Sequence, residues 1–123
     1  MEIQNQNLRN NEVQWLSTLL KKQFSKREEI IRQINNSKIE REYTKFFLLV
    51  RFNVDKKTEP INIYTRIPVE MHVYRKGSCP LQFLLHVVNG YVSELEIFYA
   101  DSSEINADLE LDKAEKIEII VEN

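Results

Sequence analysis

The residues with the most chemical potential are two histidines, one cysteine and two neighbouring glutamates in the second half of the chain. Cys79 and His86 lie seven positions apart, and a thiol that is activated by an imidazole can act as a nucleophile. Because no catalytic motif surrounds either residue, we expect Cys79 to be a structural thiol. His72 alternates with Met71 and Val73, so we expect it to point away from the core.

Glu94 and Glu96 could act together, because residues two positions apart in a strand point to the same side. Paired carboxylates can transfer protons in catalysis, but such pairs more often mark a solvated strand face, which we expect here. A metal site needs ligands at short, fixed spacing, and two histidines with one cysteine do not supply them. The chain also lacks a glycine-rich phosphate loop and a nucleophile elbow. We therefore expect no enzymatic activity, no metal and no cofactor.

The bulk properties describe one globular domain. The chain has 123 residues, of which 42% are hydrophobic, so it can bury a core as a single domain over residues 1–123. One cysteine cannot form an internal disulfide, which fits a reducing compartment. The N-terminus shows no signal-peptide pattern, and no apolar run is long enough for a membrane span. We expect a cytoplasmic protein that does not associate with membranes.

Charge is distributed unevenly along the chain. The net charge of −2 disfavours a general polyanion binder, so we expect no direct binding to nucleic acids. Residues 1–60 carry a formal charge of +4, whereas residues 61–123 carry −6. From Tyr91 onward there are 10 acidic residues and 2 lysines, which gives −8. The C-terminal third is therefore the part of the chain best suited to a basic partner.

The first third of the sequence predicts a helical hairpin. After ten polar residues that we expect to be frayed, the apolar spacing predicts a helix over residues 10–23, capped by Asn10 or Asn11. A capping-box pattern at residues 25–28 then opens a second helix over residues 25–35. The loop between the helices is short, so they should lie side by side.

After the helices the hydrophobic period changes from about 3.6 to about 2 residues, which predicts strands. Residues 38–44 are mostly polar and edge-like, whereas residues 46–54 have an apolar face formed by every even position from Phe46. Residues 61–74 contain one or two strands, and residues 116–121 form a last, edge-like strand. With the hairpin described next, the chain has about six or seven strands joined by short connections. This order predicts an α+β fold, with the helical hairpin packed on an antiparallel sheet.

The clearest local signal is Asn89-Gly90, which separates an apolar run from a run of branched and aromatic residues within 79–99. Asn-Gly favours a type I′ hairpin turn, which needs positive φ at both central residues. A two-residue turn fixes the register, so we expect Leu84 to pair with Leu95. The predicted core face is then Leu84, His86, Val88, Leu95 and Ile97, and the second face is Phe83, Leu85, Val87, Glu94 and Glu96.

The second face of this hairpin would place apolar side chains beside carboxylates, which describes a binding surface for a basic partner. The alternative is that a second layer such as the helices covers those apolar side chains and leaves the glutamates at the rim. A β-bulge would also shift the register. Both alternatives stay open on the sequence alone.

One segment resembles a known family. Residues 83–105, FLLHVVNGYVSELEIFYADSSEI, follow a signature of leucine–histidine–valine, a glycine, glutamate–leucine–glutamate–isoleucine, a tyrosine and an aspartate. The signature resembles that of small bacterial proteins, some of which are similar to immunity proteins of contact-dependent growth inhibition and related polymorphic toxin systems. Ser102 and Ser103 stand where such proteins often have a glycine turn. The matching residues are Leu85, His86, Val87, Gly90, Glu94, Leu95, Glu96, Ile97, Tyr99 and Asp101.

The resemblance implies an immunity protein, which binds and blocks a cognate toxin domain without catalysis of its own. Such toxins are frequently nucleases with basic clefts, and the acidic C-terminal third suits such a partner. We expect acidic side chains at the rim of the interface and two aromatic side chains as anchors. The predicted partner-binding residues are Glu94, Glu96, Asp101, Glu104, Asp108, Tyr91 and Phe98.

Two other functions stay open. The chain could be a small protein- or ligand-binding module of the bacterial cytoplasm, which predicts an apolar pocket between the helices and the sheet. An enzyme would need a polar cleft that contains His72, Cys79 or the carboxylates with shifted pKa values.

Overall fold

The computed structural model describes residues 1–122, in which two helices precede six strands. The helices are α1 (Asn10–Leu19) and α2 (Arg27–Asn35). The strands are β1 (Ser37–Tyr43), β2 (Leu48–Val54), β3 (Val69–Tyr74), β4 (Leu81–Val88), β5 (Tyr91–Tyr99) and β6 (Lys116–Val121).

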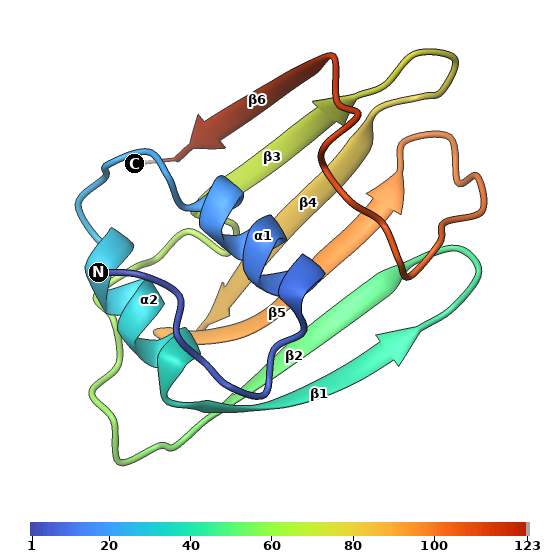
Figure 1. Cartoon of the computed structure of the whole chain (residues 1–123). Coiled ribbons are helices and arrows are strands. Elements are labelled where there is room, and N and C mark those ends of the chain that lie inside the picture. The colour runs from blue at the N-terminus through green and yellow to red at the C-terminus, as the bar shows by residue number, and fades with distance from the viewer. Residues whose placement is uncertain (123) are drawn as a thin grey trace.

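The six strands form one antiparallel sheet in the order β1-β2-β5-β4-β3-β6. Figure 1 shows α1 in front of the middle of this sheet and α2 on the same side, near the end where β4 turns into β5. The predicted α+β fold with helices packed on an antiparallel sheet is therefore confirmed. β1 and β6 are the two edges, as their composition predicted.

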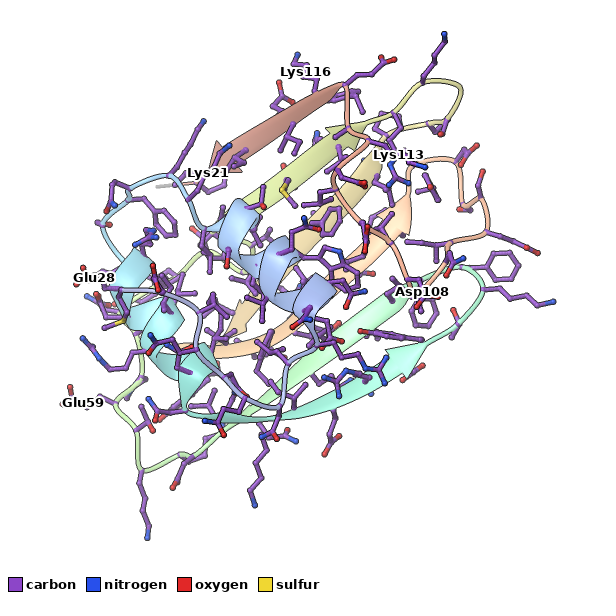
Figure 2. The ribbon with its side chains drawn as sticks, viewed as in Figure 1. Lys21, Glu28, Glu59, Asp108, Lys113 and Lys116 are labelled. Carbon is purple, nitrogen blue, oxygen red and sulfur yellow. The ribbon has the colours of Figure 1, made fainter. Side chains whose placement is uncertain are left out.

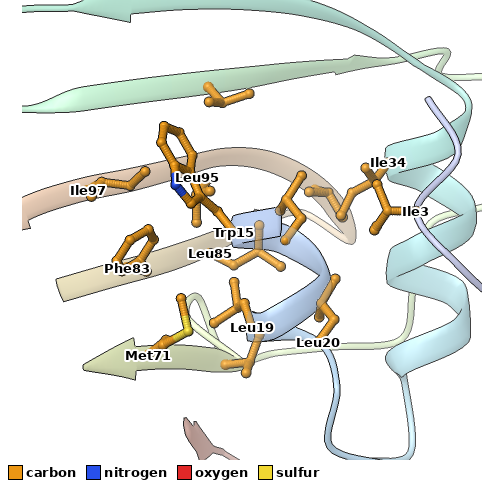
Figure 3. Close-up of a cluster of buried hydrophobic side chains, with 14 of the residues drawn as sticks. Ile3, Trp15, Leu19, Leu20, Ile34, Met71, Phe83, Leu85, Leu95 and Ile97 are labelled. Atoms are coloured by element: carbon orange, nitrogen blue, oxygen red, sulfur yellow. The ribbon is translucent and has the colours of Figure 1, made fainter. Parts of the chain in front are cut away.

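The core lies between the helices and the side of the sheet that faces them (Figure 3). Trp15 is fully buried, and its ring meets Phe83 edge-on with the ring centroids 6.1 Å apart. The Trp15 Nε1–H donates to the Leu109 carbonyl at 3.0 Å, which ties the loop between β5 and β6 to α1. The other large, fully buried side chains are Leu16, Leu19, Leu20, Ile30, Ile31, Ile34, Leu48, Met71, Leu81 and Leu85.

The predicted hairpin turn is confirmed. Asn89 has φ 52° and Gly90 has φ 83°, so both central residues have the positive φ that a type I′ turn needs. Val88 pairs with Tyr91, as the turn predicts. Position 90 requires glycine for a second reason: a Cβ there would approach the Pro60 Cβ to 2.7 Å.

Beyond the first pairs, the predicted register of the hairpin is wrong. A bulge lies between His86 and Val87, and Ser93 is the extra residue on β5. His86 therefore pairs with Glu94, and Leu85 rather than Leu84 pairs with Leu95. The slip exchanges the two faces of β4, because neighbouring side chains in a strand point to opposite sides.

The exchange of faces has a physical reason. The bulge allows Phe83, Leu85 and Val87 on β4 to face the helices together with Leu95 and Ile97 on β5, and all five are buried. An unbulged register would leave one of these apolar sets on the side away from the helices. The sequence-based alternative in which the helices cover Phe83, Leu85 and Val87 is thus the correct one, and the predicted core positions Leu84, His86 and Val88 are wrong.

The helix ends differ from the prediction. α1 ends earlier because the Lys21 N–H bonds the Thr18 carbonyl and closes a tight final turn. α2 begins at Arg27, and the capping box predicted at Ser25 does not form. The Arg27 guanidinium instead donates to the Leu20 carbonyl, so it joins the end of α1 to the start of α2.

The first ten residues, which we expected to be frayed, lie against α2 and β1. Ile3 and Leu8 are buried in the core. The Asn5 side-chain amide donates to the carbonyls of Ile34 and Ser37 at 2.8 and 2.9 Å. This amide satisfies backbone groups at the end of α2 that would otherwise lack a partner.

One strand prediction needs correction. Phe46, predicted to be a core residue, is 54% exposed because it lies in the turn between β1 and β2, where alternation no longer applies. Of the one or two strands predicted within residues 61–74, the structure has one, β3, and residues 55–68 form the connection from β2. The remaining even positions of β2 are buried as predicted: Leu48, Val50, Phe52 and Val54.

Candidate functional site

Within residues 1–122 the helices cover one side of the sheet, and we call the opposite side the outer face. Directly opposite residues in an antiparallel pair share a face, so the register separates outer-face residues from core residues. The outer face consists of Lys38, Glu40, Glu42, Leu49, Arg51, Asn53, Glu70, His72, Tyr74, Gln82, Leu84, His86, Val88, Tyr91, Glu94, Glu96, Phe98, Lys116, Glu118 and Ile120.

The outer face is acidic. Arg51 donates to Glu42 at 2.8 Å, but both side chains are more than 40% exposed, so this pair contributes little to stability. Among the described residues, Glu94 forms no ion pair. The strand residues of the outer face carry a formal charge of −3, from the carboxylates Glu40, Glu42, Glu70, Glu94, Glu96 and Glu118 and the permanent cations Lys38, Arg51 and Lys116. Two further cations come from the connection between β2 and β3, where Arg66 contacts His86 and Lys56 contacts the Tyr91 ring.

Apolar side chains lie between these carboxylates. Leu84 is half-buried and lies directly between Glu96 on β5 and Glu70 on β3. Phe98 and Ile120 are also half-buried on this face. Half-buried apolar groups ringed by carboxylates can bind a partner that has a basic rim around an apolar centre.

His86 is the centre of a hydrogen-bonded chain on the outer face, which corrects its predicted place in the core. Arg66 Nε donates to His86 Nδ1 at 3.1 Å, and His86 Nε2 lies 2.9 Å from a Glu96 oxygen. Because arginine is always a donor, Nδ1 accepts and the ring proton is on Nε2, from which it is donated to the carboxylate. Both ring nitrogens of His86 therefore have hydrogen-bond partners. These hydrogen bonds fix the segment 61–68 to the sheet.

His72 lies on the outer face and points away from the core, as predicted. It is flanked by two carboxylates, Glu118 at 3.6 Å and Glu70 at 3.8 Å. Among the described residues, no group of three or more His, Cys, Asp or Glu side chains could hold a metal ion.

The predicted partner-binding residues fall into two groups. Glu94, Glu96, Tyr91 and Phe98 lie on the outer face, although a bulge that was not part of the predicted register places them there. Tyr91 is a poor anchor for a partner, because both its hydroxyl and its ring already have partners within the protein. The hydroxyl donates to the Thr58 carbonyl at 2.9 Å. The ammonium group of Lys56 lies 3.9 Å from the centroid of the ring. Phe98 stays a candidate anchor.

The second group lies in the loop between β5 and β6, beyond the end of the sheet. Asp101, Glu104 and Asp108 are all exposed there, and Figure 2 shows Asp108 in this loop. Hydrogen bonds from the side chain and backbone of Ser103 hold the pKa of Asp101 below its usual value. The structure therefore does not bring these three acids together with Glu94 and Glu96 on one strand face.

Cys79 is exposed rather than buried as a structural thiol would be. A hydrogen bond to the Asp101 carboxylate raises the pKa of the Cys79 thiol above its ordinary value. A raised pKa lowers the thiolate fraction and hence the nucleophilicity. Cys79 also does not meet His86, because the two ring nitrogens of His86 contact Arg66 and Glu96.

A polar cluster on the helix side of the sheet was missed by sequence reasoning. Glu12 on α1 is fully buried and accepts hydrogen bonds from Arg41 and Tyr43 on β1. Its partners lie 29 and 31 positions away, so no local pattern could reveal them. The outer-face carboxylates Glu40 and Glu42, in contrast, follow from the simple alternation of β1.

Across residues 1–122, no helix has the length and apolar character to cross a bilayer. Comparison of the chain with protein-family models, with curated proteins and with solved structures finds no match. The function therefore has to be argued from the outer face itself.

Proposed function

We propose that this protein is a toxin-neutralising immunity protein that binds and blocks a cognate toxin domain, such as a nuclease, in the bacterial cytoplasm. The observation that carries the proposal is the outer face, where half-buried apolar side chains lie among six glutamates without a covering layer in residues 1–122. The resemblance of residues 83–105 to immunity proteins supports the class of partner.

The outer face supplies both properties that such a complex needs. Carboxylates raise the rate of encounter with a basic cleft, whereas desolvated apolar anchors supply most of the affinity. Leu84 and Phe98 lie on the central strands β4 and β5. Each of these two strands is held in place by a hydrogen-bonded strand on both sides. A rigid surface loses little conformational entropy on binding, which favours a tight complex.

Charge reversal on the outer face tests the proposal. We expect the double variant Glu94→Lys/Glu70→Lys to bind the toxin domain encoded by the adjacent upstream gene about tenfold more slowly at low salt. The difference should shrink as salt is added, because salt screens exposed charges. Association rates measured by surface plasmon resonance over a range of ionic strength give the result.

The matched control is Glu2→Lys/Glu28→Lys, which changes the net charge equally at two exposed positions away from the outer face. We expect this control to associate at a rate within about twofold of the wild type. Equal slowing by both double variants would assign the effect to net charge alone. Absence of any one-to-one complex with the adjacent gene product would contradict the proposed function.

A second candidate function is small-ligand binding. A cavity of about 260 Å³ lies between the α1–α2 loop and residues 62–68, lined mainly by Phe24, Ile63, Tyr64 and Pro68. It is smaller than the roughly 300–1,000 Å³ of typical ligand pockets, so we rank it second. The predicted pocket between helices and sheet is instead filled by core side chains. Concentration-dependent stabilisation by apolar fragments, lost in Phe24→Ser, would favour this function.

A further inference from the structure

The two edges of the sheet differ in how they are protected. Edge strands present unpaired N–H and C=O groups that can recruit another strand, and natural proteins usually protect them with charge or cover. β1 is rich in charge, and the Asn5 side chain bonds to the Ser37 carbonyl at its start. β6, with the sequence KIEIIV, is largely apolar and lies at the opposite edge, where Figure 2 shows Lys116 at its start.

The hydrogen bonds of β6 show which residues face outward. The Glu122 N–H donates to the Pro68 carbonyl of the neighbouring chain segment at 2.8 Å. Because the direction of backbone groups alternates along a strand, Ile117, Ile119 and Val121 direct their N–H and C=O groups away from β3. The Ile119 carbonyl confirms this direction, since it accepts a hydrogen bond from Lys22 Nζ at 2.8 Å.

β6 is complementary to a second copy of itself in one register. If two antiparallel β6 strands are centred on Ile119, then Ile117 lies opposite Val121 of the second copy, with both side chains on the helix side. Lys116 then lies opposite Glu122 of the second copy, and the symmetry produces this ion pair twice. A register centred on Glu118 would instead place Glu118 directly opposite Glu118 of the second copy.

The comparison with β1 depends on the register. A β1 pair centred on Arg41 would place Glu40 opposite Glu42 of the second copy, which is destabilising, whereas a pair centred on Ile39 would place Lys38 opposite Glu40. Composition rather than charge pairing favours β6, because KIEIIV is largely apolar, whereas SKIEREY in β1 carries the charged side chains that protect an edge strand.

We propose that β6 forms a symmetric antiparallel pair with β6 of a second copy of this chain, centred on Ile119, to give a continuous sheet. The twofold axis is perpendicular to the sheet, so both helical layers lie on one side and both outer faces on the other. The dimer therefore leaves the outer face of each copy free. Lys22 opposes the dimer, because an ammonium group at an edge resists strand pairing; we expect a weak, concentration-dependent association.

Sedimentation-velocity ultracentrifugation of the full chain at low salt tests this proposal. We expect the mass to rise from the 14.7 kDa monomer towards twice that value between about 1 μM and about 1 mM. Lys116→Glu and Glu122→Lys should each weaken dimerisation at least about tenfold, because each turns two attractive pairs into repulsive ones. The double variant Lys116→Glu/Glu122→Lys restores opposite charges across the interface and should dimerise like the wild type. Lys22→Ala should dimerise about threefold more tightly.

A monomer mass over the whole concentration range, for both the wild type and Lys22→Ala, would overturn the proposal. So would a dimer whose affinity is not restored in the double variant, because that result would place the interface elsewhere. Circular dichroism of each variant confirms that it is folded, so loss of the dimer cannot be confused with loss of structure. None of these measurements involves a toxin, so their outcome is separate from that of the proposed function.

Discussion

Gly90→Ala is expected to lower the free energy of unfolding by about 2 to 4 kcal/mol, because it combines a strained backbone with a steric clash. Gly90 has φ +83°, and a Cβ there would approach the Pro60 Cβ to 2.7 Å and the Ile61 carbonyl oxygen to 2.8 Å. The clash cannot be relieved simply, because the Gly90 carbonyl accepts the Ile61 N–H at 2.7 Å and the Gln33 side-chain amide at 3.1 Å. Equilibrium unfolding in urea gives the difference in free energy.

The matched control is Gly77→Ala, in the turn between β3 and β4. Gly77 has a nearly identical φ of +79°, but nothing lies within 4 Å of the position that a Cβ would take there. Gly77→Ala should therefore cost only the backbone strain, about 1 kcal/mol. Equal losses in the two variants would show that residues 60 and 61 can move away from the turn, and would remove the steric part of the argument.

Local chemistry explains what the sequence could predict about the hairpin. The positive φ of Asn89 and Gly90 follows from residue type, and period-2 alternation locates the strands that flank them. The bulge at Ser93 does not follow from residue type, because it depends on which register buries more apolar area against helices distant in sequence. A one-residue slip in the pairing of β4 with β5 reverses every face assignment on β4 beyond the bulge, so the predicted core face of β4 was wrong. The positions of β1 and β6 at the edges of the sheet do not depend on this register.

The outer face was predictable to a similar degree. Glu94 and Glu96 share a side because they are two positions apart, and this holds in either register. What lies beside them depends on the register, so the apolar residues opposite Glu96 are Leu84 on β4 and Leu49 on β2 rather than the predicted Phe83 and Leu85. The contact of Arg66 with His86 comes from an irregular connection, where no periodicity exists to predict it.

Glu12→Ala is expected to have the second large effect, a loss of about 3 kcal/mol in the free energy of unfolding. Glu12 is fully buried, and it accepts hydrogen bonds from Arg41 Nε and Nη2 at 2.6 Å each and from the Arg9 N–H at 2.7 Å. The Tyr43 hydroxyl also donates to it. Removing the carboxylate leaves the largely buried guanidinium with the Asn7 carbonyl as an acceptor but without its counter-ion, and it takes the acceptor of the Tyr43 hydroxyl away. A largely buried cation that loses its counter-ion is costly.

A double variant separates the loss of the ion pair from the cost of the stranded cation. In Glu12→Ala/Arg41→Met neither charge remains, and replacement of a buried pair by apolar groups is often nearly neutral. We therefore expect the double variant to recover about half of the stability lost in Glu12→Ala. A double variant that is less stable than Glu12→Ala would show that Arg41 stabilises the fold through other contacts, such as its bond to the Asn7 carbonyl.

The same carboxylate should make stability depend on pH in a defined direction. Burial alone would raise the pKa of Glu12, but the hydrogen bonds from Arg41, the Arg9 N–H and Tyr43 outweigh it and hold the pKa below the ordinary value of 4.5. Between these two pKa values the unfolded chain binds a proton that the folded chain does not, so stability rises with pH there. The contribution of Glu12 is thus complete above pH 4.5 and is lost as the pH falls through its folded pKa.

Urea unfolding of the wild type and of Glu12→Gln, from about pH 7 down to about pH 3, isolates this contribution because the other carboxylates titrate in both proteins. We expect the stability difference between the two to be constant near neutral pH and to shrink below pH 4.5, the ordinary pKa of a glutamate. A difference that stays constant down to the lowest pH would mean that folding does not shift the pKa of Glu12. A difference that instead grows as the pH falls from 7 towards 4.5 would mean that Glu12 is protonated in the folded protein. In that case Arg41 would donate to a neutral carboxyl group rather than form an ion pair, and the expected large loss in Glu12→Ala would lose its basis.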